Sequence, residues 1–451
     1  ERHQADHVLL WVFDMTTLAP TIDSGLDAFV EYLDTTLGET SSEGRIVRDV
    51  FGRLTFIAPP ALDDATVAAA GADLPEALRP FLTPKAPLLP ASSSLATPLL
   101  EEAGVPIVAP LGARYILLDR RVAGEGWLSA PPHEVSAVPR LAFYGLKGGV
   151  GRSTALAVCA ADLALTGANV LVLDLDLEAP GLESVLLRPD RVPDYGVLDW
   201  MAAATAGLDV SQPVPDMIGG SPFTSGSGLV DVVPVVGRLT QARPDTFLSK
   251  LSRAYTPGAP SGEFMGKSFA QKVQVLLEQL EGRRRYDVVL LDVRAGLHET
   301  SAASLLGLGA KVLLFGTNSP HTFSGYSILL STVRQAMEAW ESAPELRDRF
   351  QMVHGRALNN AQDRALFLSN CWQLWLEHLY DAVDDDVDVE AFSFDLDDQT
   401  APHYPLTVSS AEAFMNFNPD ADPDLLTAHG YASTYGELLS FVRGYVFTKA
   451  S

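Results

Sequence analysis

From about residue 140 onward, short and nearly continuous apolar runs alternate with longer stretches that carry apolar residues at helical spacing. Apolar runs without alternating polar positions are typical of strands that are buried on both faces of a parallel sheet. Helical stretches between such runs favour βαβ units, so we expect an α/β domain here. The predicted strands are residues 141–145, 169–175, 229–236, 287–293, 310–316 and 350–354. The predicted helices are residues 153–166, 268–282, 324–339, 366–379 and 435–447.

The pattern in the first part of the chain is weaker. It predicts a helix at residues 26–37 and strands at residues 8–13, 54–57, 105–110 and 115–119. Residues 82–98 are rich in proline and serine, which indicates a loop or an extended connector. The scattered polar residues form no catalytic constellation; they are His7, Asp14, Asp119 and His133. We therefore expect a smaller α/β accessory domain of unknown function at residues 1–138, followed by the larger domain at residues 139–451.

Composition restricts the class of partner. The chain has 451 residues, of which 47% are hydrophobic and 20% charged, as in folded proteins. Its net charge of −25 disfavours non-specific binding to nucleic acid or to an anionic membrane surface. No apolar run is long enough for a membrane span, and the expected last helix has a single basic residue, Arg443, instead of a basic amphipathic face. We expect a cytoplasmic protein, and the missing initiator Met is compatible with a piece of a longer one.

Two segments are candidates for contacts with a protein partner. The long loop at residues 205–228 is rich in glycine and proline, and loops of this length are usually functional or mobile. Residues 365–442 contain 15 Asp and Glu but no Lys or Arg. This acidic stretch predicts either a solvated face or a docking surface for a basic partner.

The spacing of the other reactive side chains indicates neither a disulfide framework nor a metal site. Cys159 and Cys371 are too few for a disulfide framework or a CxxC metal site, and their apolar neighbours predict burial in a core. His298, Glu299 and His321 lack the spacing of metal ligands, so we expect ordinary hydrogen-bonded side chains.

A glycine loop follows the first strand of the larger domain. The sequence from Lys147 to Thr154 is K-G-G-V-G-R-S-T, and a helix is predicted directly after it. A strand, a glycine loop and a helix together direct backbone N–H groups and the positive end of the helix dipole toward a bound phosphate. The amide cradle would consist of Gly148, Gly149, Val150 and Gly151. The alternative for a glycine loop alone is a structural turn.

Carboxylates follow two further strands. Asp174 and Asp176 end the second predicted strand, and Asp292 ends the strand at residues 287–293, with Gly296 four residues later. The carboxyl ends of adjacent parallel strands are where α/β sheets place ligand contacts, so we expect these side chains near the glycine loop.

Together the three segments resemble the ParA/MinD family of P-loop ATPases, whose deviant loop reads K-G-G-x-G-K-[ST]. The loop K-G-G-V-G-R-S-T is followed by D-L-E-A-P-G-L, which begins at Asp176, and by D-x-R-x-G, which begins at Asp292. This combination resembles a bacterial branch of the family in which arginine replaces the second lysine. The resemblance implies a parallel-sheet P-loop fold of the SIMIBI class that binds ATP and Mg²⁺ and forms a nucleotide-dependent homodimer.

The resemblance also implies roles for individual residues. Lys147 would reach the phosphates held by the other subunit, the alternative being an ordinary exposed lysine. Ser153, Asp176 and Asp292 would form the metal site, with Asp176 also directing the attacking water. Thr154 would lie near the α-phosphate and Gly296 near the γ-phosphate.

The roles of several residues are less definite. Asp174 belongs either to the metal shell or to the framework of the loop. Arg294 either senses the γ-phosphate or forms a surface salt bridge. Arg152 would grip phosphate with a longer, planar group than lysine, so binding should survive while hydrolysis becomes slow or conditional. The contact to adenine would come from Asn359 or Asn360.

The resulting hypothesis is an ATP-binding and ATP-hydrolysing molecular switch that dimerises around Mg-ATP and signals to a partner. The alternative is a nucleotide-sensing interaction module without turnover. A related bacterial tyrosine kinase would need a tyrosine-rich tail, which this chain lacks.

Overall fold

The computed structural model describes residues 21–102, 104–108, 113–121, 125–127, 136–224, 226–256, 258–259, 262–339, 345–382 and 391–449. The strand predicted at residues 8–13 lies outside these ranges, as do His7, Asp14 and His133. The chain divides into two compact units, residues 1–125 and residues 126–451, and each is described by itself.

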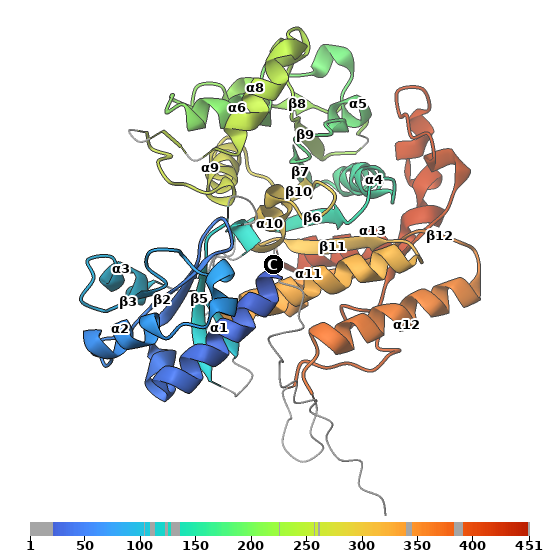
Figure 1. Ribbon diagram of the computed structural model, residues 1–451. Coiled ribbons are helices and arrows are strands. Elements are labelled where there is room, and N and C mark those ends of the chain that lie inside the picture. Colours follow the sequence, from blue (N-terminus) through green and yellow to red (C-terminus); the bar gives the residue numbers. More distant parts are fainter. Residues whose placement is uncertain are drawn as a thin grey trace, which may run out of the picture. The chain divides into compact units, whose positions relative to one another are not determined.

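The first unit contains a mixed sheet of five strands in the order β3-β2-β1-β5-β4 (Figure 1). The strands are β1 (Arg45–Arg48), β2 (Leu54–Ile57), β3 (Leu88–Leu89), β4 (Val105–Val108) and β5 (Arg114–Asp119), and the helices are α1 (Ile22–Leu37), α2 (Asp64–Ala72) and α3 (Ala96–Glu101). Helix α1 begins after Thr21, whose hydroxyl accepts the Ser24 N–H at 3.1 Å, and it buries Phe29, Val30 and Leu33. The connector predicted at residues 82–98 is wrong in part, because it contains β3 and the start of α3.

The second unit is built on an eight-stranded sheet in the order β13-β12-β11-β6-β10-β7-β9-β8. The strands are β6 (Arg140–Gly145), β7 (Asn169–Asp174), β8 (Gly219–Gly220), β9 (Leu229–Val233), β10 (Val288–Asp292), β11 (Lys311–Gly316), β12 (Phe350–Ala357) and β13 (Leu406–Ser409). Every neighbouring pair is parallel except β8 and β9. The six predicted strands are confirmed, whereas the short edge strands β8 and β13 were missed.

Helices cover both faces of this sheet, as nearly continuous apolar strands require (Figure 1). They are α4 (Arg152–Leu165), α5 (Leu182–Leu186), α6 (Val197–Thr205), α7 (Arg238–Gln241), α8 (Phe247–Ala254), α9 (Phe269–Glu281), α10 (Glu299–Ala302), α11 (Pro320–Ala339), α12 (Ala361–His378) and α13 (Ala428–Lys449). Helices α4 and α13 contribute to one core, and helices α6, α9, α11 and α12 to the other. Cys159 and Cys371 are fully buried, one in each core, as predicted.

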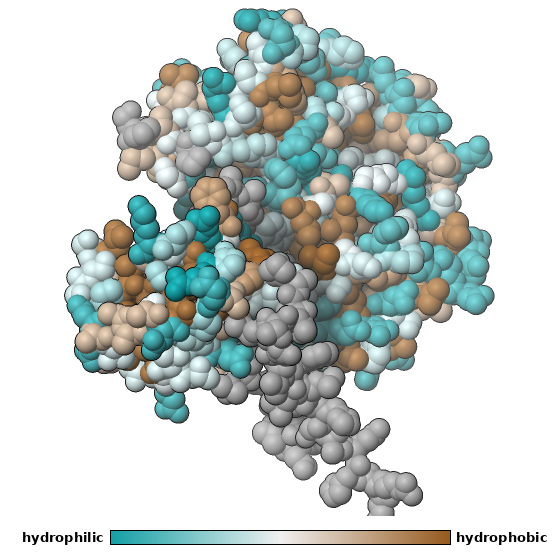
Figure 2. Space-filling view, in the orientation of Figure 1, coloured by the Kyte–Doolittle hydropathy of each residue, from teal (hydrophilic) through white to brown (hydrophobic). Residues whose placement is uncertain are grey.

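The surface of the second unit is mixed in character. Figure 2 shows hydrophilic residues over much of the visible face, with hydrophobic residues between them. Within the described ranges, no helix combines the length and apolar character needed to cross a bilayer.

Lys272 of helix α9 is buried without a carboxylate among its hydrogen-bond acceptors. Its side chain is 1% exposed, and Nζ donates to Thr205 Oγ1 at 3.1 Å, to the Ala254 carbonyl at 2.8 Å and to the Thr256 carbonyl at 2.9 Å. The two carbonyls lie at the C-terminal end of α8, where a positive charge is favourable. Burial nevertheless lowers the pKa of this ammonium group to about 8.

The depressed pKa of Lys272 predicts a pH-dependent contribution to stability. Between pH 8 and the ordinary lysine pKa of 10.5, the unfolded chain binds a proton at this position that the folded protein has lost, so stability rises with pH. Relative to Lys272→Met, the free energy of unfolding of the wild type should increase by up to about 1.4 kcal/mol per pH unit between pH 8 and 10. Urea unfolding of both proteins at several pH values measures this difference. A difference that does not change with pH would contradict the prediction.

Candidate functional site

The glycine loop between β6 and α4 has the backbone conformation of an anion cradle. Gly149 and Gly151 have φ values of 78° and 92°, in the left-handed region that favours glycine. Gly151 precedes the first residue of α4, and no described side chain caps that helix N-terminus. A Cβ at Gly148, Gly149 or Gly151 would meet no atom within 4 Å. The loop therefore leaves open space beside the positive end of a helix, and no described group accepts a hydrogen bond from the N–H groups of residues 148–151.

The sheet brings the predicted carboxylates to the edge where this loop begins. Strand β10 lies between β6 and β7, and Asp292 is paired in register with Phe143 on one side and Asp174 on the other. Since all three strands are parallel, the segments that follow them leave the sheet at the same edge.

Asp174 supports the loop that follows β7. One of its carboxylate oxygens accepts the Asp176 N–H at 3.0 Å, and the other accepts the Leu182 N–H at 3.4 Å. Burial and the nearby Asp292 carboxylate raise its pKa well above the usual range. Both oxygens are thus engaged with backbone, which suits a framework role.

Asp176 and Asp292 each have a buried carboxylate oxygen, Oδ1, without a hydrogen-bond partner among the described residues. Burial raises the pKa of Asp292 to about 6, although the Arg152 charge and a hydrogen bond from Ser153 oppose the shift. Two such oxygens beside a serine hydroxyl are hard donors of the kind that Mg²⁺ binds. The described residues contain no cluster of three or more His, Cys, Asp or Glu side chains fit to hold a metal. A magnesium ion would therefore need phosphate oxygens and water as well.

The Arg152 side chain is buried and contacts the segments that follow β7 and β10. Its guanidinium group donates to the Val293 carbonyl, and Nη2 lies 3.6 Å from Asp176 Oδ2. The Arg152 and Asp176 side chains are only 8% and 13% exposed. Burial raises the pKa of Asp176, and the charges of Arg152 and Arg294 oppose this rise. Arg152 thus joins the segments that follow β7 and β10.

Lys147 and Gly296 lie near the start of the glycine loop. Lys147 is exposed and, in the described part of the chain, has no hydrogen-bond or ion-pair partner. Val150 is buried, whereas Ser153 and Thr154 are half-buried at the start of α4. Gly296 has a φ of 85°, and its N–H donates to the Gly145 carbonyl at 3.3 Å. The glycine after Asp292 therefore lies against the start of the glycine loop.

A polar cluster lies beside these segments, and it contains the salt bridge that was one of the two alternatives predicted for Arg294. Glu178 pairs with Arg294, Tyr255 donates its hydroxyl to Glu178 at 3.2 Å, and His298 Nε2 lies 3.6 Å from the same carboxylate. Burial is the main cause that lowers the pKa of His298, with help from the Arg294 charge. The sequence feature that points to the Glu178–Arg294 contact is that each residue follows a predicted site carboxylate by two positions.

The remaining candidates have ordinary partners or lie in solvent. Glu299 accepts the Gly126 N–H at 2.7 Å, and His321 is exposed. Asn360 caps helix α12 by accepting the Gln362 N–H at 2.9 Å, whereas Asn359 is exposed.

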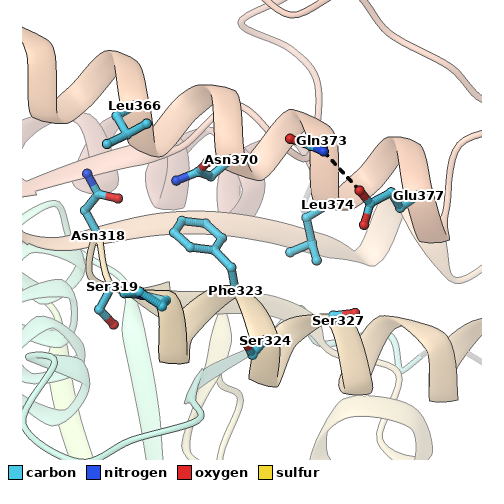
Figure 3. A pocket seen from close by; sticks show the side chains of 11 residues that line it. Asn318, Ser319, Phe323, Ser324, Ser327, Leu366, Asn370, Gln373, Leu374 and Glu377 are labelled. Atoms are coloured by element: carbon cyan, nitrogen blue, oxygen red, sulfur yellow. Dashed lines mark hydrogen bonds between the residues drawn. The ribbon is translucent and has the colours of Figure 1, made fainter.

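A cavity of about 570 Å³ lies between helices α11 and α12 (Figure 3). Its lining contains carboxamides, hydroxyls and a phenyl ring. They include Asn318, just before α11, Phe323 and Ser324 of α11, and Asn370 and Gln373 of α12. No residue of the glycine loop belongs to this lining, so the cavity is distinct from the phosphate cradle.

Comparisons with known proteins give a likeness of architecture. No family model and no curated protein matches the chain. A McdA variant from Cyanothece in complex with ATP is 15% identical, with a TM-score of 0.41, over 69% of this chain and 97% of that one. ParA of pNOB8 is 16% identical, with a TM-score of 0.43, over 69% and 98%. MinD of Pyrococcus furiosus is 18% identical, with a TM-score of 0.39, over 68% and 98%.

Proposed function

We propose that residues 126–451 bind Mg-ATP and hydrolyse it, and that they act as a switch that dimerises around the nucleotide and signals to a protein partner. The observation that carries the proposal is the meeting, at one sheet edge, of an uncapped helix N-terminus, a serine hydroxyl and two carboxylate oxygens without a partner among the described residues. An anion and a divalent cation together satisfy all of these groups.

Each residue then has a definite task. The N–H groups of residues 148–151 bind the β- and γ-phosphates, Thr154 lies near the α-phosphate, and Gly296 lets the backbone approach the γ-phosphate. Ser153, Asp176 and Asp292 would hold the magnesium ion, Asp292 through water. Bound Mg²⁺ neutralises phosphate charge.

Asp176 orients the attacking water and accepts its proton. Burial raises its pKa above the ordinary value, which favours proton acceptance, and Arg152 holds the carboxylate in place. Lys147, which is exposed and without a described partner, reaches the phosphates of the second subunit and stabilises the charge that develops during transfer.

A non-hydrolysing nucleotide sensor is the second candidate. The observation that favours it is that Arg152, at the position of the usual loop lysine, is engaged with Asp176 and the Val293 carbonyl.

Phosphate release by the wild type, Lys147→Ala and Asp176→Ala tests the proposal. Both variants should lose about 10²-fold or more in rate, while calorimetry still detects ATP uptake, because each group acts mainly in the transition state. Lys85→Ala and Asp216→Ala, which change exposed residues elsewhere, are the matched controls. Unchanged rates in both site variants would rule out the proposed ATP hydrolysis at this site. ATP uptake without phosphate release would favour the non-hydrolysing sensor, and a lack of ATP uptake would rule out both functions.

A further inference from the structure

The Glu178 carboxylate joins three segments that are distant in sequence. It comes from the loop after β7, two residues beyond Asp176, and it pairs with Arg294, two residues beyond Asp292. Its second partner is the hydroxyl of Tyr255, which lies directly after α8. One side chain thus contacts both carboxylate-bearing segments and a helical segment outside the phosphate cradle.

Tyr255 is itself held in place by its surroundings. Its ring lies 5.2 Å from the His298 ring and 5.9 Å from the Phe269 ring, centroid to centroid. The carbonyls of the residues on either side of it, Ala254 and Thr256, both accept hydrogen bonds from the buried Lys272. The hydroxyl that reaches Glu178 therefore comes from backbone that is fixed to helix α9.

The exposure of the ion pair argues against a role in global stability. The Glu178 and Arg294 side chains are 32% and 26% exposed, and pairs as open as this contribute at most about 1 kcal/mol. Its effect is on geometry, because it adds a second side-chain link between two loops that Arg152 also joins. Arg294 is also one of the charges that act on Asp176.

We propose that Glu178 is a positioning residue, which binds Arg294 and Tyr255 and thereby aligns the Asp176 and Asp292 segments with each other and with helices α8 and α9. A partner that displaces α8 would then alter the alignment of the two carboxylates. The alignment follows from contacts within the chain, and its effect on ATP hydrolysis rests on the proposed function.

Hydrogen–deuterium exchange of the nucleotide-free protein tests the alignment without any activity. Glu178→Gln and Arg294→Gln should each raise exchange several-fold in peptides from residues 176–182 and from residues 294–300 together, because either change removes a contact that both loops share. Tyr255→Phe should raise exchange in the same peptides. Glu338→Gln, which breaks the exposed Arg334–Glu338 pair, is the matched control. Faster exchange confined to the loop that carries the substitution, or no change, would overturn the proposal.

Kinetics test the consequence for hydrolysis. Glu178→Gln and Arg294→Gln should each lower kcat about tenfold while the Kd for ATP stays within about threefold, and the double variant should lose no more than either single one. Arg294→Lys, which keeps the charge, should restore part of kcat. Additive losses would mean that the two residues act separately. If the wild type fails to hydrolyse ATP, the proposed function fails, and the exchange experiment still decides the alignment.

Discussion

Asp292→Asn should raise the stability of the nucleotide-free protein and, in the same protein, weaken binding of Mg-ATP. Asp292 is 3% exposed, one of its oxygens has no described partner, and its pKa is raised to about 6. Because the folded protein binds this proton more tightly than the unfolded chain does, the ionised carboxylate opposes folding above pH 6. An amide removes that charge, so the gain in the free energy of unfolding should approach about 3 kcal/mol at pH 8.

The pH dependence separates this effect from a simple change in packing. The gain should shrink as the pH falls through 6 and vanish near pH 4, where the wild-type carboxyl is protonated in both states. Thermal unfolding of both proteins at pH 4.5, 6 and 8 measures it, with Asp216→Asn as the exposed control. A loss of stability at pH 8 would contradict the prediction.

The same substitution should weaken the binding of Mg-ATP, and the cause differs from that of the gain in stability. If Asp292 holds Mg²⁺ through water, the affinity for Mg-ATP should fall by roughly 100-fold, whereas binding of ATP without the metal should change little. Calorimetry with and without Mg²⁺ distinguishes the two. If binding weakens equally with and without Mg²⁺, Asp292 does not contribute to the metal site.

Arg152→Met should destabilise the protein strongly. The substitution leaves the nearly buried Asp176 carboxylate without its main positive neighbour and leaves the Val293 carbonyl without this donor. Removing one partner of a buried pair typically destabilises by about 3–5 kcal/mol, because the other charge stays buried and uncompensated. Urea unfolding at pH 7 measures the loss.

The double variant Arg152→Met/Asp176→Asn distinguishes a lost charge from lost packing. It should recover most of the stability, since neither partner is then charged. Arg334→Met, which breaks an exposed pair, is the control and should change stability by less than about 1 kcal/mol. If Arg152→Met resembles this control, the guanidinium group does not compensate Asp176.

The apolar runs predicted the six central strands because each is buried on both faces and therefore has no alternating polar positions. The same reasoning failed for edge strands: β8 is two glycines, and β13 is four residues that pair on one side. Helix α13 begins at Ala428, well before the predicted start at residue 435. Gly430 and Gly436 lower its intrinsic propensity, whereas Tyr431 and Leu438 are buried against the α4 side of the sheet.

The sequence by itself determined the glycine loop, the position of each carboxylate at a strand end and the parallel sheet, because these features depend on local conformation and on spacing along the chain. Only the tertiary structure decided that Arg152 faces Asp176, that Asp174 binds backbone and that Glu178 meets Arg294 and Tyr255. The longest of these contacts, between Glu178 and Arg294, joins residues more than a hundred positions apart. Strand register and burial fix these contacts, and a one-dimensional pattern contains neither.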